Sequence, residues 1–228
     1  MKKNVGAERN QSDIKTKIRR RLVIALVIII IGAPFLFAPS DVFAFGIGIL
    51  GGMGVFEIWQ ISKNSQRHRD SLLAVLFAVY LCVSLFLCYR LRFSENGLSW
   101  LFFGVLLIGV FDSASYLGGK KFGKRKITPH ISPKKTLEGL ISGFIGCGVI
   151  SLIVGNWLFS LFLWQLASIA VIVGTLAFFG DLFESLLKRK MQVKDSSSIL
   201  KSHGGLLDRI DSALAVIYGL YFLKFWFF

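Results

Sequence analysis

Long apolar segments alternate with short polar ones along nearly the whole chain. A helix that crosses a membrane needs about 20 mostly apolar residues. Seven segments are long and apolar enough: 22–38, 42–61, 71–89, 98–117, 137–155, 157–180 and 208–227. Polar residues separate them, as at Pro39-Ser40-Asp41 after the first segment and at Asn156 before the sixth. The pattern predicts an all-α, polytopic integral membrane protein with about seven transmembrane helices.

Composition supports this prediction. Of the 228 residues, 54% are hydrophobic and 22 are Phe, and the mean hydropathy is +0.64, well above that of an ordinary soluble domain. Cys82, Cys88 and Cys147 lie inside apolar segments without the spacing of metal ligands. We interpret them as small buried hydrophobic residues rather than as disulfide or zinc ligands.

The positive charge indicates an orientation. The net charge is +14, and the basic clusters flank the apolar segments. If the N-terminus is cytoplasmic, 24 of the 27 Lys and Arg residues fall on the cytoplasmic side, as the positive-inside rule expects. Clusters in these positions favour membrane lipids and phosphate substrates as partners, and we expect no nucleic acid.

The expected organisation has three parts. Residues 1–21 form a basic cytoplasmic tail, residues 22–117 form the N-terminal transmembrane helices, and residues 118–228 form a catalytic region. The third part contains the two long polar loops, at 118–136 and 188–207. The first apolar segment leads through Ala33-Pro34 directly into more hydrophobic sequence, so we expect it to be retained rather than cleaved.

The stretch 180–212 combines acids, bases and glycines between two apolar segments. Asp181 and Glu184, and likewise Asp208 and Asp211, are spaced i, i+3, which places each pair on one face of a helix. Between the pairs lie Lys188, Arg189, Lys190, Lys194, Lys201, His203, Gly204 and Gly205. Mg²⁺ binds such carboxylates together with substrate phosphate oxygens. Metal-assisted phosphate chemistry is therefore the predicted function, although a topology signal with ordinary helix caps explains either feature alone.

The loop 118–136 is basic and rich in glycine. Ser132-Pro133 is suited to begin the next helix, with Ser132 or Thr136 as its cap, and free amides at a helix N-terminus attract phosphate. Lysines here would make charge-assisted contacts to a triphosphate. The two nearest that helix are Lys134 and Lys135. A positive-inside loop with an ordinary cap remains the alternative.

Two acids lie inside apolar segments. Asp112 is late in the fourth segment, and Glu57 is late in the second. An acid in a membrane is costly unless it faces a partner or a polar cavity, so both are functional candidates. For Glu57, an equally good interpretation is that it reaches the interface or pairs with a neighbouring helix.

These residues carry a resemblance to a known family. The run HGGLLDRID from His203 to Asp211, after Ser185, Lys188, Arg189, Lys194 and Asp195, resembles the signature of phosphatidate cytidylyltransferases (CDP-diacylglycerol synthases). The first loop matches the same family at Asp112, Ser113, Tyr116, Gly119, Phe122, Gly123, Ser132, Pro133, Lys134, Lys135, Thr136, Glu138 and Gly139. The matched blocks cover residues 110–212. Lys201 and Ser202 stand where the family has Pro-Gly, and Ser115 replaces Ala.

The resemblance implies transfer of a cytidylyl group from CTP to phosphatidate, giving CDP-diacylglycerol and pyrophosphate in phospholipid biosynthesis. The catalytic candidates are Asp181, Lys194, Asp208, Arg209 and Asp211. The substrate-binding candidates are Asp112, Ser132, Lys134, Lys135, Lys188, Arg189, His203, Gly204 and Gly205. Mg²⁺, with room for a second cation, would be held by Asp181, Asp208 and Asp211. The resemblance also suggests a homodimer in the bacterial inner membrane, with the active site facing the cytoplasm.

Other functions fit part of the pattern. A polyprenol kinase or an archaeal-type CDP-lipid synthase would share the architecture but agree less well with the long signature. A transporter or a non-catalytic scaffold would use its intramembrane acids differently. The acids cluster at helix ends rather than at mid-membrane, which argues against a transporter.

Overall fold

The computed structural model describes residues 35–63, 68–129, 131–190 and 205–227. The chain divides into two units, Met1–Phe43 and Ala44–Phe228. In the first unit, the ring of Phe35 stacks on that of Phe43, with centroids 4.8 Å apart. The predicted tail 1–21 and most of the predicted helix 22–38 lie outside the described residues.

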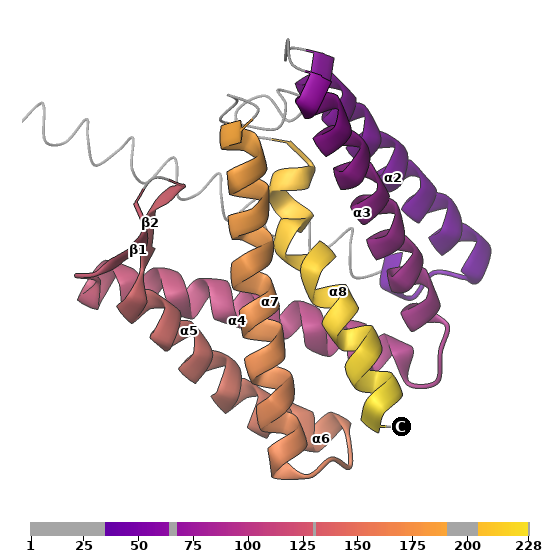
Figure 1. The fold of residues 1–228 in the computed structure, drawn as a ribbon. Helices are drawn as coiled ribbons and strands as arrows, with labels where there is room; N and C mark the ends of the chain where they lie inside the picture. The colour runs from indigo at the N-terminus through magenta and orange to yellow at the C-terminus, as the bar shows by residue number, and fades with distance from the viewer. Residues whose placement is uncertain (1–34, 64–67, 130, 191–204, 228) are drawn as a thin grey trace, which may run out of the picture. The chain divides into compact units, whose positions relative to one another are not determined.

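Within the described residues, six helical spans are long and apolar enough to cross a membrane. In chain order they are formed by α2 (Ser40–Lys63), α3 (His68–Arg92), α4 (Gly97–Phe122), α5 (Leu137–Ile150) with the short helices that follow it, α7 (Leu163–Lys190) and α8 (Leu207–Phe227) (Figure 1). They coincide with six of the seven predicted segments. The prediction of an all-α polytopic membrane protein is confirmed.

Small residues bring α4 and α5 into close contact. A Cβ atom added to Gly118 would overlap the Ser142 side chain, and one added to Gly143 would overlap Ser115 Oγ. A Cβ atom at Gly139 would lie 2.7 Å from the Ser115 carbonyl oxygen. Helices in a membrane associate by this kind of close backbone packing. The pair therefore holds the two ends of the basic loop 118–136 together.

Helices α7 and α8 lie side by side (Figure 1), and they approach closely where the predicted acids lie. A Cβ atom at Gly180 would lie 2.9 Å from both the Asp211 carbonyl oxygen and Ala215 Cβ. Close by, the Ser212 hydroxyl donates a hydrogen bond to the Ala177 carbonyl oxygen at 3.2 Å. The missing side chain of Gly180 thus lets the two acid-bearing helices approach one another.

A hydrophobic cluster joins α7 and α8 to α2 and α3. Its buried members are Ile58, Ile61, Ala74, Phe77, Leu81, Leu187, Leu207 and Leu214. Beside it, the ring of Tyr80 stacks on Tyr218 with centroids 5.6 Å apart, and the edge of Phe183 meets Tyr80 at 5.8 Å. These contacts hold α3 against the pair that carries most of the predicted site.

The predicted helix break at Asn156 is wrong. After α5 the helix continues through a π-helical segment, Ser151–Gly155, and α6, Asn156–Leu158. The break comes at residues 159–162, where the side chain of Gln165 accepts the Phe162 N–H at 2.8 Å and so caps α7. A Gln three residues into a helix is a known capping partner, whereas a single Asn does not end a helix that packing supports.

The basic loop contains a small sheet, which the helical pattern did not predict. Helix α4 runs on to Phe122, and strands β1 (Lys126–Thr128) and β2 (Ser132–Thr136) then form an antiparallel hairpin. Ser132 lies in β2 and does not start the next helix, so that alternative is wrong. Thr136 is the N-cap of α5 and accepts the Gly139 N–H at 3.2 Å, as the other alternative predicted. Pro133 is accommodated because each strand of a two-stranded sheet is an edge strand.

We expect Gly180→Ala to lower the free energy of unfolding by about 1–3 kcal/mol, because the added methyl group overpacks the α7–α8 contact. Thermal unfolding in detergent measures this. Gly148→Ala is the matched control, since a Cβ atom at Gly148 has no neighbour within 4 Å. Equal midpoints for the two variants would contradict the close contact.

Candidate active site

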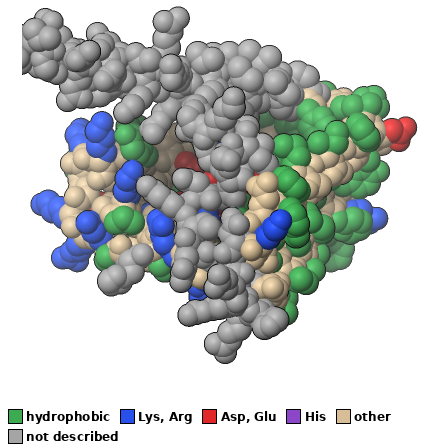
Figure 2. All heavy atoms as spheres, turned by 90° about the horizontal axis from the view of Figure 1, so that it is seen from above, with side chains coloured by type: hydrophobic (Ala, Val, Ile, Leu, Met, Phe, Trp, Pro, Cys, Tyr) green, Lys and Arg blue, Asp and Glu red, His purple; other side chains and the backbone are tan. Residues whose placement is uncertain are grey.

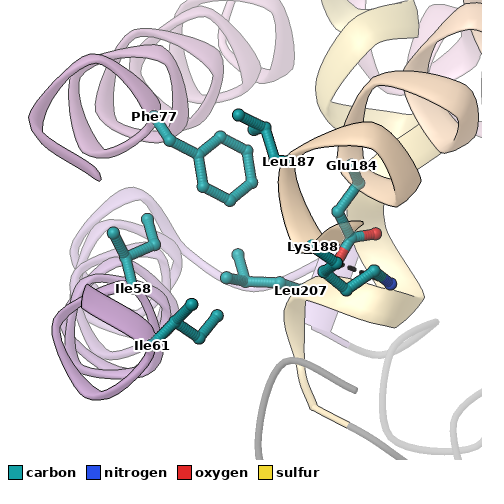
Figure 3. A pocket seen from close by; sticks show the side chains of 7 residues that line it. All are labelled: Ile58, Ile61, Phe77, Glu184, Leu187, Lys188 and Leu207. Atoms are coloured by element: carbon teal, nitrogen blue, oxygen red, sulfur yellow. Dashed lines mark ion pairs between the residues drawn. The ribbon is translucent and has the colours of Figure 1, made fainter. Parts of the chain in front are cut away.

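Lys188, in the last turn of α7, connects that helix to the start of α8. Its ammonium group lies 3.4 Å from Glu184 Oε1 and makes a closer ion pair with Asp208 Oδ1. The exposed fractions of the side chains are 16% for Lys188, 5% for Glu184 and 16% for Asp208. Figure 3 shows Glu184 and Lys188 paired beside Leu207. Charges this well removed from water are stable because they are paired.

Asp208 also shapes the turn that enters α8. Its Oδ2 atom accepts the Gly205 N–H at 2.8 Å, while Oδ1 faces Lys188. Gly205 and Lys188, two predicted substrate-binding residues, thus both contact Asp208, a predicted catalytic residue. The predicted site residues Lys194, His203 and Gly204 lie outside the described residues.

Lys135 of β2 reaches across to α7. Its ammonium group lies 3.1 Å from Asp181 Oδ2, donates to the Phe178 carbonyl oxygen at 3.1 Å, and sits 4.4 Å from the centroid of the Phe178 ring. The other oxygen of Asp181 accepts the Ser185 hydroxyl at 3.3 Å. The β1–β2 hairpin is therefore fixed to α7, the helix that carries Asp181 and Glu184.

Asp112 and Asp211 complete the group of acids. Asp112, on α4, is in electrostatic contact with Asp181, Asp211 and Lys135. Asp211, on α8, is in electrostatic contact with Asp181, Glu184 and Lys188. Carboxylates from three helices thus share one environment with two lysines.

Glu184 is a site residue that the prediction of catalytic residues left out. It is 3% exposed, and within the described part of the chain neither carboxylate oxygen has a hydrogen-bond partner. Lys188 balances its charge without satisfying its lone pairs. In the sequence, the i, i+3 spacing from Asp181 was the signal that could have identified Glu184 as a candidate. A buried carboxylate with open lone pairs is suited to accept a cation or a donor from a ligand.

Hydrogen bonds already occupy the start of α5. The Leu137 N–H donates to the Arg125 carbonyl oxygen at 2.8 Å, and the Gly139 N–H donates to Thr136 Oγ1 at 3.2 Å. The Glu138 carboxylate in turn accepts the Arg125 N–H at 3.2 Å. These bonds reduce what the first amides of α5 can offer to an anion.

Basic side chains gather at the hairpin end of this face, apart from its hydrophobic surface (Figure 2). The exposed ones are Lys120, Lys121, Lys124, Arg125, Lys126 and Lys134. Of the other predicted residues, Arg189 on α7 and Arg209 on α8 are exposed, and Ser132 is half-buried in β2. The structure therefore places Lys134, Arg189 and Arg209 on the surface, whereas Lys135 and Lys188 are partly buried.

A metal site is not preformed in the described part of the chain. There, no three His, Cys, Asp or Glu side chains are arranged to hold a metal ion. Asp181 pairs with Lys135, and Asp208 pairs with Lys188. Mg²⁺ commonly uses only one or two carboxylates and completes its shell with water and substrate phosphates. The open oxygens of Glu184 fit such a site, and the predicted ligand set of Asp181, Asp208 and Asp211 stays a prediction.

Apolar spanning helices that end in paired lysines and carboxylates define an integral membrane protein with a group of paired charges at its helix ends. The chain belongs to the Cytidylyltransferase family, whose family model matches residues 12–227. The predicted family resemblance is thereby confirmed.

Several relatives are named phosphatidate cytidylyltransferase. The protein from Staphylococcus saprophyticus is 35% identical over 158 residues, and that from Staphylococcus haemolyticus is 36% identical over 159 residues. The protein from Staphylococcus epidermidis is 33% identical over 159 residues. In each case the match covers 69% of this chain and 60% of the relative. The chain thus spans about three fifths of the length of these relatives.

We expect Lys135 and Asp181 to be energetically coupled. A double-mutant cycle of Lys135→Ala and Asp181→Ala, followed by thermal unfolding, should give a coupling free energy of about 0.5–1 kcal/mol. The value is modest because the side chain of Asp181 is 45% exposed. The same cycle with Lys134, which is exposed, should give no coupling. Equal coupling for both lysines would contradict a specific link between β2 and α7.

Proposed function

We propose that the protein transfers the cytidylyl group of CTP to phosphatidate, with release of pyrophosphate. The observation that carries the proposal is the paired group of lysines and carboxylates from β2, α7 and α8, in a chain of the Cytidylyltransferase family. The relatives' name, phosphatidate cytidylyltransferase, supports the same reaction.

The reaction joins two anions. A phosphate oxygen of phosphatidate forms a bond to the α-phosphorus of CTP, and the bond from that phosphorus to the oxygen bridging to the β-phosphate breaks. The lipid phosphate is already ionised at neutral pH, so no strong general base is required. What the site must supply is positive charge, which lowers the repulsion between the reactants and stabilises the pyrophosphate as it leaves.

Lys188 and Lys135 are the residues we assign to this task. Each ammonium group is held by carboxylates in the structure, Lys188 by Glu184 and Asp208, and Lys135 by Asp181. The flexible stem of a lysine carries its point charge from one acceptor to another. We infer that both lysines turn toward phosphate oxygens when substrates bind, while the exposed Lys134, Arg189 and Arg209 attract the anions from solution.

The site is suited to Mg²⁺. In its described part, two lysines pair with three carboxylates, and Asp112 and Asp211 bring two further acidic groups to the same environment. We assign Mg²⁺ to Asp181, Asp208 and Asp211, with Glu184 as a further ligand and room for a second cation. When bound, the metal would neutralise charge on the phosphates and on the leaving pyrophosphate.

The proposal includes a location. The distribution of Lys and Arg residues along the chain favours a site on the cytoplasmic face of the bacterial inner membrane, where CTP is present. The acyl chains of phosphatidate would remain among the apolar helices, with the phosphate at the charged helix ends. The family resemblance further suggests a homodimer.

The first test is release of pyrophosphate by detergent-purified protein given CTP, Mg²⁺ and phosphatidate. We expect release that depends on the lipid and falls below detection in Asp208→Asn. Asparagine keeps an acceptor for the Gly205 N–H but removes the charge that Lys188 and a metal require. Glu95→Gln, which changes an exposed carboxylate in the turn between α3 and α4, should leave the rate unchanged.

Two outcomes would count against the assignment. Full activity of Asp208→Asn would exclude a role for its charge. Phosphate transfer to a polyprenol, with none of the cytidylyl product from phosphatidate, would move the protein to a lipid kinase.

Removal of divalent cations should abolish turnover, and added Mg²⁺ should restore it. CTP should also raise the thermal midpoint of the protein with Mg²⁺ present and raise it much less with a chelator, because phosphate oxygens complete the ligand shell. Unchanged turnover in excess chelator would contradict the metal assignment and leave the two lysines as the source of charge.

A further inference from the structure

Glu57 of α2 is bonded to the start of α8. Its side chain is 0% exposed, and its carboxylate accepts two backbone N–H groups, that of Leu206 at 2.8 Å and that of Leu207 at 3.1 Å. These groups lie 149 and 150 residues further along the chain. Helix caps ordinarily come from a residue next to the helix. Here a distant transmembrane helix supplies the cap.

Three consecutive amides at this helix start are accepted by carboxylates. Asp208 accepts the Gly205 N–H at 2.8 Å, and Glu57 accepts the next two. The first N–H groups of a helix have no partner within the helix, and the helix dipole favours negative charge there. In other proteins this arrangement binds a substrate phosphate. In this protein its own acids occupy those three amides.

Apolar contacts fix the same junction. The side chain of Leu207 packs on Gly54, one turn before Glu57, where a Cβ atom would lie 3.4 Å from Leu207 Cδ2. Ile58 and Ile61 of α2 line a small pocket together with Leu207 and Lys188 (Figure 3). The face of α2 that carries Glu57 therefore holds the first residue of α8 by polar and apolar contacts at once.

We propose that Glu57 is a positioning residue for cytidylyl transfer, an inference that rests on the proposed function. Leu207 directly precedes Asp208, and Asp211 lies one turn further along the same helix. Release of the Leu206 and Leu207 amides would let the start of α8 fray and shift both aspartates away from Lys188. Because carboxylates already accept these three amides, lysine side chains would bind the substrate phosphates.

The test compares Glu57→Leu and Glu57→Gln. Leucine has a similar volume and leaves both amides unpaired, whereas glutamine keeps one acceptor. We expect kcat to fall roughly 10- to 100-fold in Glu57→Leu, as when partners of catalytic ligands are removed, and less in Glu57→Gln. The KM for CTP should change by less than about threefold, because the basic side chains that bind phosphate are retained.

Hydrogen–deuterium exchange in detergent supplies a readout that does not depend on turnover. Amides of residues 205–212 should exchange faster in Glu57→Leu than in the wild type, with Glu57→Gln between them. Ser84→Ala is the matched control, since Ser84 is 1% exposed and its hydroxyl donates a hydrogen bond within α3, to the Tyr80 carbonyl oxygen. This control should leave kcat and the exchange of 205–212 unchanged.

Wild-type kcat and exchange in Glu57→Leu would overturn the inference. Loss of kcat without faster exchange would also overturn it, because Glu57 would then act by a route other than α8. Equal effects in Ser84→Ala would also overturn it, because loss of any buried hydrogen bond would then be enough to lower kcat and speed exchange. A wild-type protein that releases no pyrophosphate would overturn the proposed function, and the exchange experiment would still decide whether Glu57 holds α8.

Discussion

Burying charge in a membrane is costly, and pairing is what makes this structure possible. Lys188 lies between Glu184 and Asp208, and Lys135 joins Asp181, so the acids of α7 and α8 are stabilised by one lysine of α7 and one of β2. Glycines permit the pairing, since Gly180 lets α7 and α8 approach at the level of the acids. Chemistry and architecture therefore depend on the same few ion pairs.

The paired arrangement explains how such a site can remain folded before substrates arrive. Each lysine already has an anionic partner, so its charge is not left alone in a poorly solvated place. In the proposed reaction, incoming phosphates would offer the lysines new partners, and a bound cation would offer the same to the carboxylates that the lysines leave. The site would then act by an exchange of ionic partners, without creating new charges.

Sequence alone was sufficient for the six described spans and for the proximity of several predicted site residues, whose roles stay predictions. Strong hydropathy predicted the spans from α2 to α8, and i, i+3 spacing predicted that each pair of acids lies on one face of its helix. Prediction from the sequence failed where local structure depends on tertiary contacts. The break before α7 depends on the side chain of Gln165, and the hairpin depends on backbone bonds that helical periodicity does not reveal. The partner of Glu57 could not be read from spacing, because it lies 149 residues away.

That separation has a consequence for biogenesis. A ribosome adding about 5–20 residues per second needs on the order of 10 seconds to make the chain between Glu57 and the start of α8. During that time α2 has already been made, but α8, the helix that it anchors, has not. The charged end of α8 can be secured only after α8 itself has been made and inserted. In a chain that stops before α8, the two hydrogen bonds from Leu206 and Leu207 to Glu57 are absent, and the proposed site is incomplete.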